Sequence, residues 1–97
     1  RDPIEFQGAA LLGAAYEEEG RLDDAEATYL RIADRSKLDF QVRNALSSAA
    51  RIKVSQGDGE GAIQLYQRAL ETFEANEPAR GIYELRIQEL MMAGVSQ

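Results

Sequence analysis

The 97-residue chain has no cysteine, histidine or tryptophan. Without histidine it lacks the side chain whose ordinary pKa lies near neutrality, and without cysteine it has no thiolate nucleophile, disulfide or zinc–thiolate site. A chain of this length forms one domain at most, with a modest core and little room for an enclosed active site. The sequence therefore predicts a protein that is not an enzyme and holds no cofactor or metal.

An excess of basic charge and long apolar runs are also missing. The chain has 11 lysines and arginines against 17 aspartates and glutamates, for a formal net charge of −6. This charge disfavours binding to nucleic acid or to anionic membranes. No apolar run approaches the roughly 20 residues that cross a bilayer. We expect a soluble chain without membrane insertion, and the lack of cysteine is compatible with both the cytoplasm and the bacterial periplasm.

An internal repeat organises the chain. Gly20, Gly57 and Gly94 are separated by equal spacings of 37 residues. The same shift superposes further identical or similar residues: Asp2 on Asp39 and Asn76, Ala25 on Ala62, Tyr29 on Tyr66, Arg31 on Arg68, and Arg43 on Arg80. Self-similarity at a fixed period indicates a repeat architecture. We expect one domain with a first unit over about 2–38, a second over about 39–75 and a partial third over 76–97.

The apolar residues of each unit recur with a helical period, and no alternating strand pattern competes. Asp2, Asp39 and Asn76 precede such segments as expected N-caps, and the two prolines fall in first turns. The three repeated glycines are expected to close the first helix of each unit. The expected helices cover about 3–18, 23–36, 40–56, 60–75 and 78–93, with neighbours antiparallel because their connections are short.

Local motifs for chemistry are weak. The glycine-rich stretch 57–61 lacks the lysine of a phosphate-binding loop and the spaced oxygen ligands of a calcium loop, so we interpret it as a turn in which Asp58 caps the next helix. Ser47 and Ser48 have no histidine to act as base and read as small polar surface residues. Six acidic residues between positions 17 and 26 read as a solvated helix end followed by an acidic helix start.

The residues of the first unit resemble the tetratricopeptide repeat, matching its pattern at Leu12, Gly13, Tyr16, Gly20, Ala25, Tyr29 and Ile32. The second unit matches at Leu46, Ala50, Gly57, Ala62, Tyr66 and Ala69, and the partial third at Tyr83, Ile87, Leu90 and Gly94. The resemblance implies an all-α fold of antiparallel helix-turn-helix repeats stacked as a short right-handed superhelix. Three features depart from the family: a period of 37 instead of 34 residues, Lys37 and Glu74 where the family has proline, and Lys53 where it prefers an aromatic residue.

Small residues stand where the two helices of each unit are expected to cross. These are Gly13 and Ala25 in the first unit, and Ala50 and Ala62 in the second. Because they carry little or no side chain, the paired helices can approach closely while larger residues fill the flanks. The physics of packing therefore agrees with the resemblance.

The resemblance further implies a noncatalytic scaffold that binds a protein or peptide partner. The partner would lie along a concave wall formed by the first helix of each unit. Carried over position by position, the wall comprises Gln7, Leu11, Ala14, Glu17, Asn44, Ser48, Arg51, Ser55, Glu84, Leu85, Gln88 and Met91. Arg51 is the residue expected to engage a carboxylate. A carboxylate clamp of the chaperone-binding type is not expected, because Asn44 alone matches it, whereas Ala10, Ala14, Glu84 and Gln88 occupy its other positions.

The last expected helix is apolar around much of its circumference. We expect Leu85, Met91, Met92 and Val95 to form a face for capping or self-association that the rest of the chain does not cover. Such a helix needs cover on more than one side. Three alternatives remain open: a further helix of a longer protein, a target peptide, or the same face of a second copy. The last of these makes a homo-oligomerisation module the alternative function, with a two-fold dimer as its form.

Overall fold

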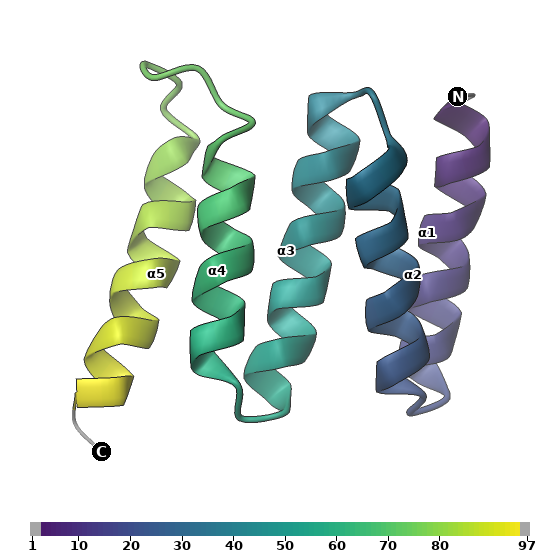
Figure 1. Cartoon of the computed structure of the whole chain (residues 1–97), viewed down its shortest axis with the longest axis horizontal. Coiled ribbons are helices and arrows are strands. Elements are labelled where there is room, and N and C mark those ends of the chain that lie inside the picture. Colours follow the sequence, from purple (N-terminus) through teal and green to yellow (C-terminus); the bar gives the residue numbers. More distant parts are fainter. Residues whose placement is uncertain (1–2, 96–97) are drawn as a thin grey trace.

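The computed structural model describes residues 3–95 and consists of five α-helices joined by short connections (Figure 1). The helices are α1 (Pro3–Glu18), α2 (Leu22–Arg35), α3 (Asp39–Ser55), α4 (Gly59–Leu70) and α5 (Arg80–Val95). Each connection reverses the chain, so neighbours in sequence are antiparallel neighbours in space. No strand occurs in residues 3–95, and the predicted all-α class is confirmed.

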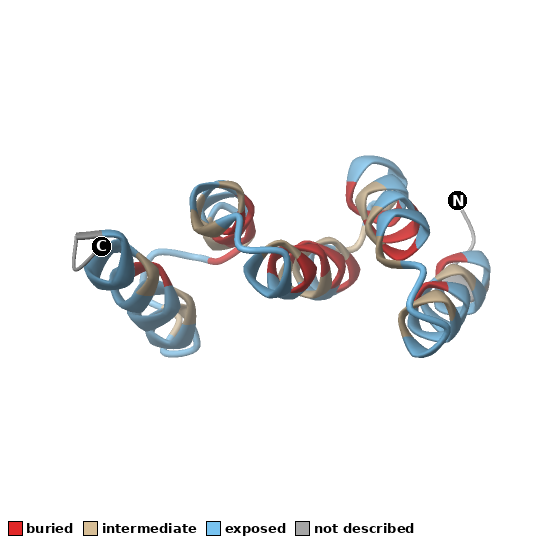
Figure 2. Ribbon diagram, turned by 90° about the horizontal axis from the view of Figure 1, so that it is seen from below, coloured by how far each residue is buried: buried red, intermediate tan, exposed pale blue. Residues whose placement is uncertain are grey.

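The helices form two layers (Figure 2). One contains α2 and α4, the other contains α1, α3 and α5, and the buried residues lie mainly where the layers meet. Each helix packs chiefly on the helices before and after it in the chain, as in other repeat proteins. The molecule measures 41 × 35 × 16 Å along its principal axes, so it is a thin slab. Its α1, α3 and α5 layer, called here the α1–α3–α5 wall, is the expected binding wall.

Two of the three repeated glycines make the predicted turns. Gly20 and Gly57 have φ values of 78° and 81°, in the left-handed region that favours glycine. The amide of Arg21 donates to the carbonyl of Tyr16 at 2.8 Å, and the amide of Asp58 donates to the carbonyl of Lys53 at 2.9 Å. These bonds satisfy carbonyls at the ends of α1 and α3 and reverse the chain.

The third glycine does not end its helix, and this prediction is wrong. Gly94 lies inside α5 and, unlike Gly20 and Gly57, does not have a positive φ. Asp39 was also expected to be an N-cap, but it is the first residue of α3, and the N-cap is Leu38. The carboxylate of Asp39 therefore complements the helix dipole instead of capping the helix. Asp2, another expected cap, lies outside the described residues. Asp58 does cap α4 as predicted, since its carboxylate accepts the Gly61 amide at 2.8 Å.

The connection between α4 and α5 is longer than expected. The helix α4 ends at Leu70 instead of residue 75, and Pro78 lies in the turn before α5 instead of in its first turn. The ring of Phe73 is buried against Tyr83, with 5.4 Å between ring centroids, which turns the chain inward after α4. Proline also disfavours helical conformation in the residue before it, here Glu77.

Small residues line both helix crossings as predicted. Gly13 is buried, and Ala25, Ala50 and Ala62 are fully buried. A Cβ atom built on Gly13 would lie 2.8 Å from the ring of Tyr29, closer than real Cβ atoms approach. The absence of a side chain at Gly13 is therefore a requirement for the Tyr29 ring to lie directly on α1.

We predict that Gly13→Ala destabilises the protein by about 1–2 kcal/mol, because the clash with Tyr29 outweighs the gain in helix propensity. The matched control is Gly8→Ala on the same helix. A Cβ atom there meets nothing within 4 Å, so this change should stabilise by about 0.5–1 kcal/mol. Urea unfolding followed by circular dichroism measures both, and equal shifts in the same direction would contradict the assignment.

Candidate interaction surface

A pocket opens in the α1–α3–α5 wall where α1, α2 and α3 meet. It encloses about 170 Å³. Five of its lining residues are buried: Phe6, Tyr29, Ile32, Gln41 and Ala45. The others are exposed or half-buried: Gln7, Ala10, Phe40, Asn44 and Ser48. The pocket therefore has a mainly apolar interior that also contains the amide side chain of Gln41, and a partly polar mouth.

Three predicted wall residues meet at this pocket. Gln7 comes from α1, and Asn44 and Ser48 come from α3 one helical turn apart. Leu11 is also on α1 and is 74% exposed. The resemblance to the repeat family predicted these residues on one wall, and the structure adds the pocket between them.

Farther along the wall, an ion pair joins α1 and α3. Arg51 of α3 donates from Nη1 to Oε1 of Glu17 on α1 at 2.5 Å, and from Nη2 to Oε2 at 3.2 Å. The hydroxyl of Tyr29 on α2 donates to Oε2 of Glu17 at 2.6 Å. Glu17 thus joins three helices at one point, called here the Glu17 network.

Each member of the Glu17 network influences the ionisation of the others. The hydrogen bond from Arg51 holds the pKa of Glu17 below its ordinary value, assisted by the bond from Tyr29 and opposed by burial. Burial, together with the bond to Glu17, raises the pKa of Tyr29 to about 12. The bond to Glu17 also raises the pKa of Arg51. The carboxylate and the guanidinium are therefore both charged at neutral pH.

The remaining predicted wall residues have simpler surroundings. Ser55 donates from its hydroxyl to the carbonyl of Ile52 at 2.7 Å within α3. The exposed side chain of Glu84 lies 3.9 Å from the half-buried side chain of Arg80 as an ion pair in α5. Ala14 and Gln88 are exposed. These residues present side chains to solvent, and none of them lines the second pocket, of about 240 Å³, which Arg51 borders between α3 and α5.

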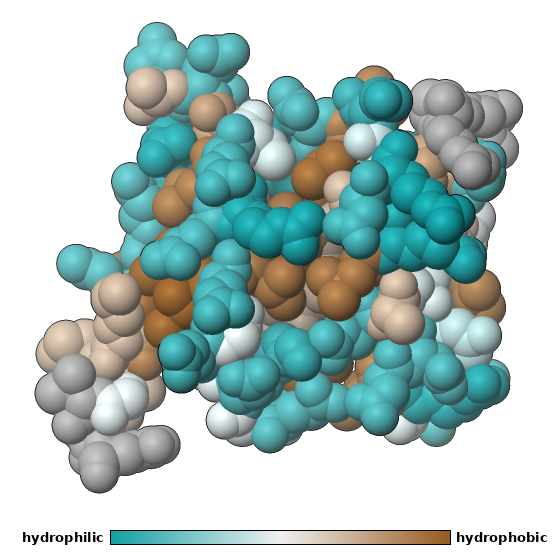
Figure 3. All heavy atoms as spheres, in the orientation of Figure 1, coloured by the Kyte–Doolittle hydropathy of each residue, from teal (hydrophilic) through white to brown (hydrophobic). Residues whose placement is uncertain are grey.

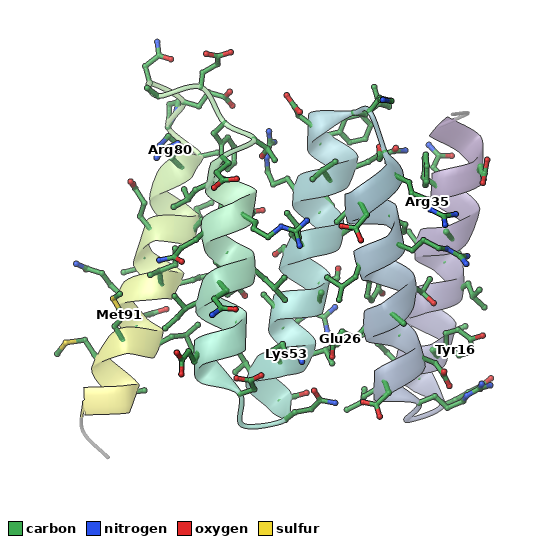
Figure 4. All side chains as sticks on the ribbon, in the orientation of Figure 1. Tyr16, Glu26, Arg35, Lys53, Arg80 and Met91 are labelled. Carbon is green, nitrogen blue, oxygen red and sulfur yellow. The ribbon has the colours of Figure 1, made fainter. Side chains whose placement is uncertain are left out.

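Polar side chains bridge the first and second units beyond the wall. Lys53 of α3 lies 3.0 Å from Glu26 of α2, and the two side chains face each other between these helices (Figure 4). This bond raises the pKa of Lys53. Gln56 donates to Asp23 at 3.4 Å nearby. The lysine that departs from the family's aromatic preference thus has a specific partner.

Apolar and aromatic side chains join the second unit to α5. Tyr83 packs on Tyr66 and Phe73, with ring centroids 6.0 and 5.4 Å away. Arg43 lies over Phe73 at 3.8 Å and donates to the Thr72 hydroxyl at 3.0 Å. These contacts place the start of α5 against the end of α4.

An open furrow of about 770 Å³ runs between α4 and the end of α5. Ile63 of α4 and Leu90 and Met91 of α5 line it, together with Val54. Figure 3 shows hydrophobic side chains between α4 and α5, and further ones toward the middle of the same face. Ile63 and Leu90 lie 37 positions after Glu26 and Lys53, which form an ion pair between the first and second units. The equivalent positions between the second unit and α5 are therefore apolar.

The predicted self-association residues are exposed where they are described. The exposed fractions are 57% for Leu85, 51% for Met91 and 68% for Met92. Met91 also lines the furrow from α5, and Figure 4 labels its side chain. The side chain of Val95 lies outside the described residues. The exposed apolar residues of α5 are Ile82, Leu85, Met91 and Met92, which are spread around the helix.

Sequence reasoning missed Phe6, Phe40 and Tyr29 as wall residues. Phe40 is 52% exposed and precedes Asn44 by one helical turn, so extending the α3 stripe by one turn would have found it. No sequence signal identifies the other two as pocket residues, because helical periodicity assigns them to the core. The pairing of Glu17 with Arg51 was also not predicted.

Residues 3–95 contain no group of three or more side chains that could hold a metal ion. In the same range no helix has the length and apolar character needed to cross a membrane. No curated protein and no solved structure matches the chain. A family model, described as the tetratricopeptide repeat, matches residues 9–40 and again residues 45–76. These two matches together cover more than half of the chain.

The chain belongs to the tetratricopeptide-repeat family. This membership confirms the predicted stacked helix-turn-helix arrangement, because the two matched segments run from α1 to the start of α3 and from α3 past the end of α4. Tetratricopeptide repeats are generally protein–protein interaction modules and typically noncatalytic. At this level the predicted class of function is confirmed.

The Glu17 network predicts a pH dependence of stability. Because the folded-state pKa of Glu17 lies below the ordinary value of 4.5, its stabilising contribution is complete well above that value and is lost as the pH falls through the folded-state pKa. We expect Glu17→Gln to cost about 1 kcal/mol at pH 7, since Arg51 is largely exposed.

The cost should shrink as the pH is lowered from about 5 to about 3. Urea unfolding of wild type and variant across this range measures it. The control is Glu18→Gln, which removes the same charge from an exposed neighbouring position. A cost for Glu17→Gln that does not depend on pH would contradict the electrostatic role of Glu17.

Proposed function

We propose that this chain is a noncatalytic scaffold that binds an extended segment of a protein or peptide along the α1–α3–α5 wall. The observation that carries the proposal is the pocket between α1, α2 and α3, with amide side chains on both sides of its mouth. The hydrogen bonds between described residues do not use the side chains of Gln7 or Asn44. Each amide offers a donor and an acceptor, which is what an extended main chain needs.

Arg51 has a smaller role in this proposal than the sequence suggests. Its guanidinium already binds Glu17 through two nitrogens, so its charge is largely balanced. The side chain is still 58% exposed and has further N–H groups that can donate to a partner. We therefore assign Arg51 to holding α1 and α3 together at the wall and to supplying a secondary contact.

The test uses peptides selected from a random displayed library against the whole chain. We expect the double substitution Gln7→Ala and Asn44→Ala to raise the Kd of a selected peptide about tenfold, since each lost hydrogen bond contributes about 0.5–1.5 kcal/mol. Fluorescence anisotropy with a labelled peptide measures the Kd. The control, Gln64→Ala, changes an exposed amide on α4 in the other layer and should leave the Kd unchanged. The opposite ranking of these variants would place the binding site elsewhere.

A second candidate function is self-association through α5. The observation that favours it is the exposure of Leu85, Met91 and Met92 on one helix, which is uncommon for a soluble monomer. A two-fold dimer would bury the same face of both copies.

This second candidate predicts a dimer whose mass falls to that of a folded monomer in Leu85→Lys. Light scattering on a sizing column over a hundredfold range of concentration measures the mass. Gln67→Lys adds the same charge to an exposed position on α4 and should leave a dimer intact. A wild type that is monomeric throughout the range removes this candidate and leaves the binding proposal unaffected.

A further inference from the structure

The pocket in the α1–α3–α5 wall has the size of one large apolar side chain. Its volume is about 170 Å³. A protein cavity of about 150 Å³ lined by apolar residues accommodates benzene. We propose that this pocket holds a leucine or phenylalanine side chain of an extended peptide that carries net positive charge. The inference rests on the proposed function and specifies its ligand.

The lining of the pocket selects an uncharged side chain. None of its ten lining residues carries a charge. Its buried part is formed by Phe6, Tyr29, Ile32 and Ala45, together with Gln41, whose side-chain oxygen accepts a hydrogen bond from Ser36. A charged side chain entering it would lose its water without gaining an ionic partner. A leucine or phenylalanine side chain instead exchanges water for apolar contacts.

The mouth of the pocket selects an extended main chain. Gln7 on α1 and Asn44 on α3 border it from two helices, and Phe40 flanks it with about half of its surface exposed. In a helical peptide the main-chain groups are already bonded to one another, whereas in an extended one they are free to bind these amides. The anchor would therefore enter the pocket while the amides on both sides hold its backbone.

The net charge of the chain favours a basic peptide. Arg51, one of the cations of the neighbouring wall, is paired with Glu17. The chain as a whole carries a formal charge of −6. Lysine or arginine next to the anchor would be attracted, and an acidic peptide would be repelled.

The experiment begins with a random displayed peptide library selected on the whole chain. Enriched peptides should share one leucine or phenylalanine position and contain more lysine and arginine than aspartate and glutamate. One selected peptide is then synthesised with its anchor intact and with the anchor replaced by alanine. The replacement should raise the Kd about tenfold, which corresponds to about 1.4 kcal/mol.

A pair of variants on α1 tests the pocket itself. Ala10→Phe places a ring into the pocket from its α1 side and should raise the Kd of the intact peptide about tenfold or more. Ala15→Phe adds the same ring at an exposed position of α1 away from the pocket and should change the Kd less than about twofold. Circular dichroism verifies that both variants are folded.

The outcomes distinguish failure of the inferred pocket ligand from failure of the proposed binding along the wall. If the peptides depend on Gln7 and Asn44 but tolerate both Ala10→Phe and loss of the anchor, the pocket inference is wrong and binding along the wall stands. If they depend on none of these residues, both proposals are wrong. Selection of acidic peptides, or no enrichment at all, would also overturn the inferred ligand.

Discussion

The contact between Tyr29 and the bare backbone of Gly13 is the constraint on which the first half of the molecule depends. A Cβ atom at Gly13 would lie 2.8 Å from the ring, so the glycine permits the close crossing of α1 and α2. The same ring lines the pocket, and its hydroxyl donates to Glu17, which binds Arg51 of α3. One aromatic residue thereby links the crossing within a unit, the junction between units and the candidate binding surface.

The two junctions of this short array are stabilised by different forces. At the first, Lys53 pairs with Glu26 and Arg51 pairs with Glu17. The residues 37 positions after Glu26 and Lys53 are Ile63 and Leu90, which line a furrow together. Ion pairs of partly exposed groups are screened by salt, whereas apolar burial is not. In a linear repeat protein each junction contributes separately to stability, so solution conditions act unequally along the chain.

Much of the fold follows from the sequence because its determinants are local. The 37-residue spacing, the glycines at positions 20 and 57, and the small residues at the crossings predict the antiparallel helices and their pairing. The early end of α4 was not predictable from these signals, because it depends on Phe73 packing against Tyr83 across a turn. The resemblance to the repeat family predicted Gln7, Asn44 and Ser48 on one wall. It did not reveal the pocket or the Glu17 network, since these bring together side chains of three helices.

Positions 37 residues apart have the same role in helix packing, but their side chains differ in what they offer to a binding partner. The residues 37 positions after Phe6 and Phe40, which line the pocket, are Arg43 and Glu77. Arg43 lies over Phe73 and binds Thr72, so it fastens α3 to the end of α4 instead of lining an apolar pocket. The repeated spacing specifies where helices cross, and this requires only small residues and glycines. Recognition depends on the larger residues between them, and their differences confine the pocket to the first unit and the start of the second.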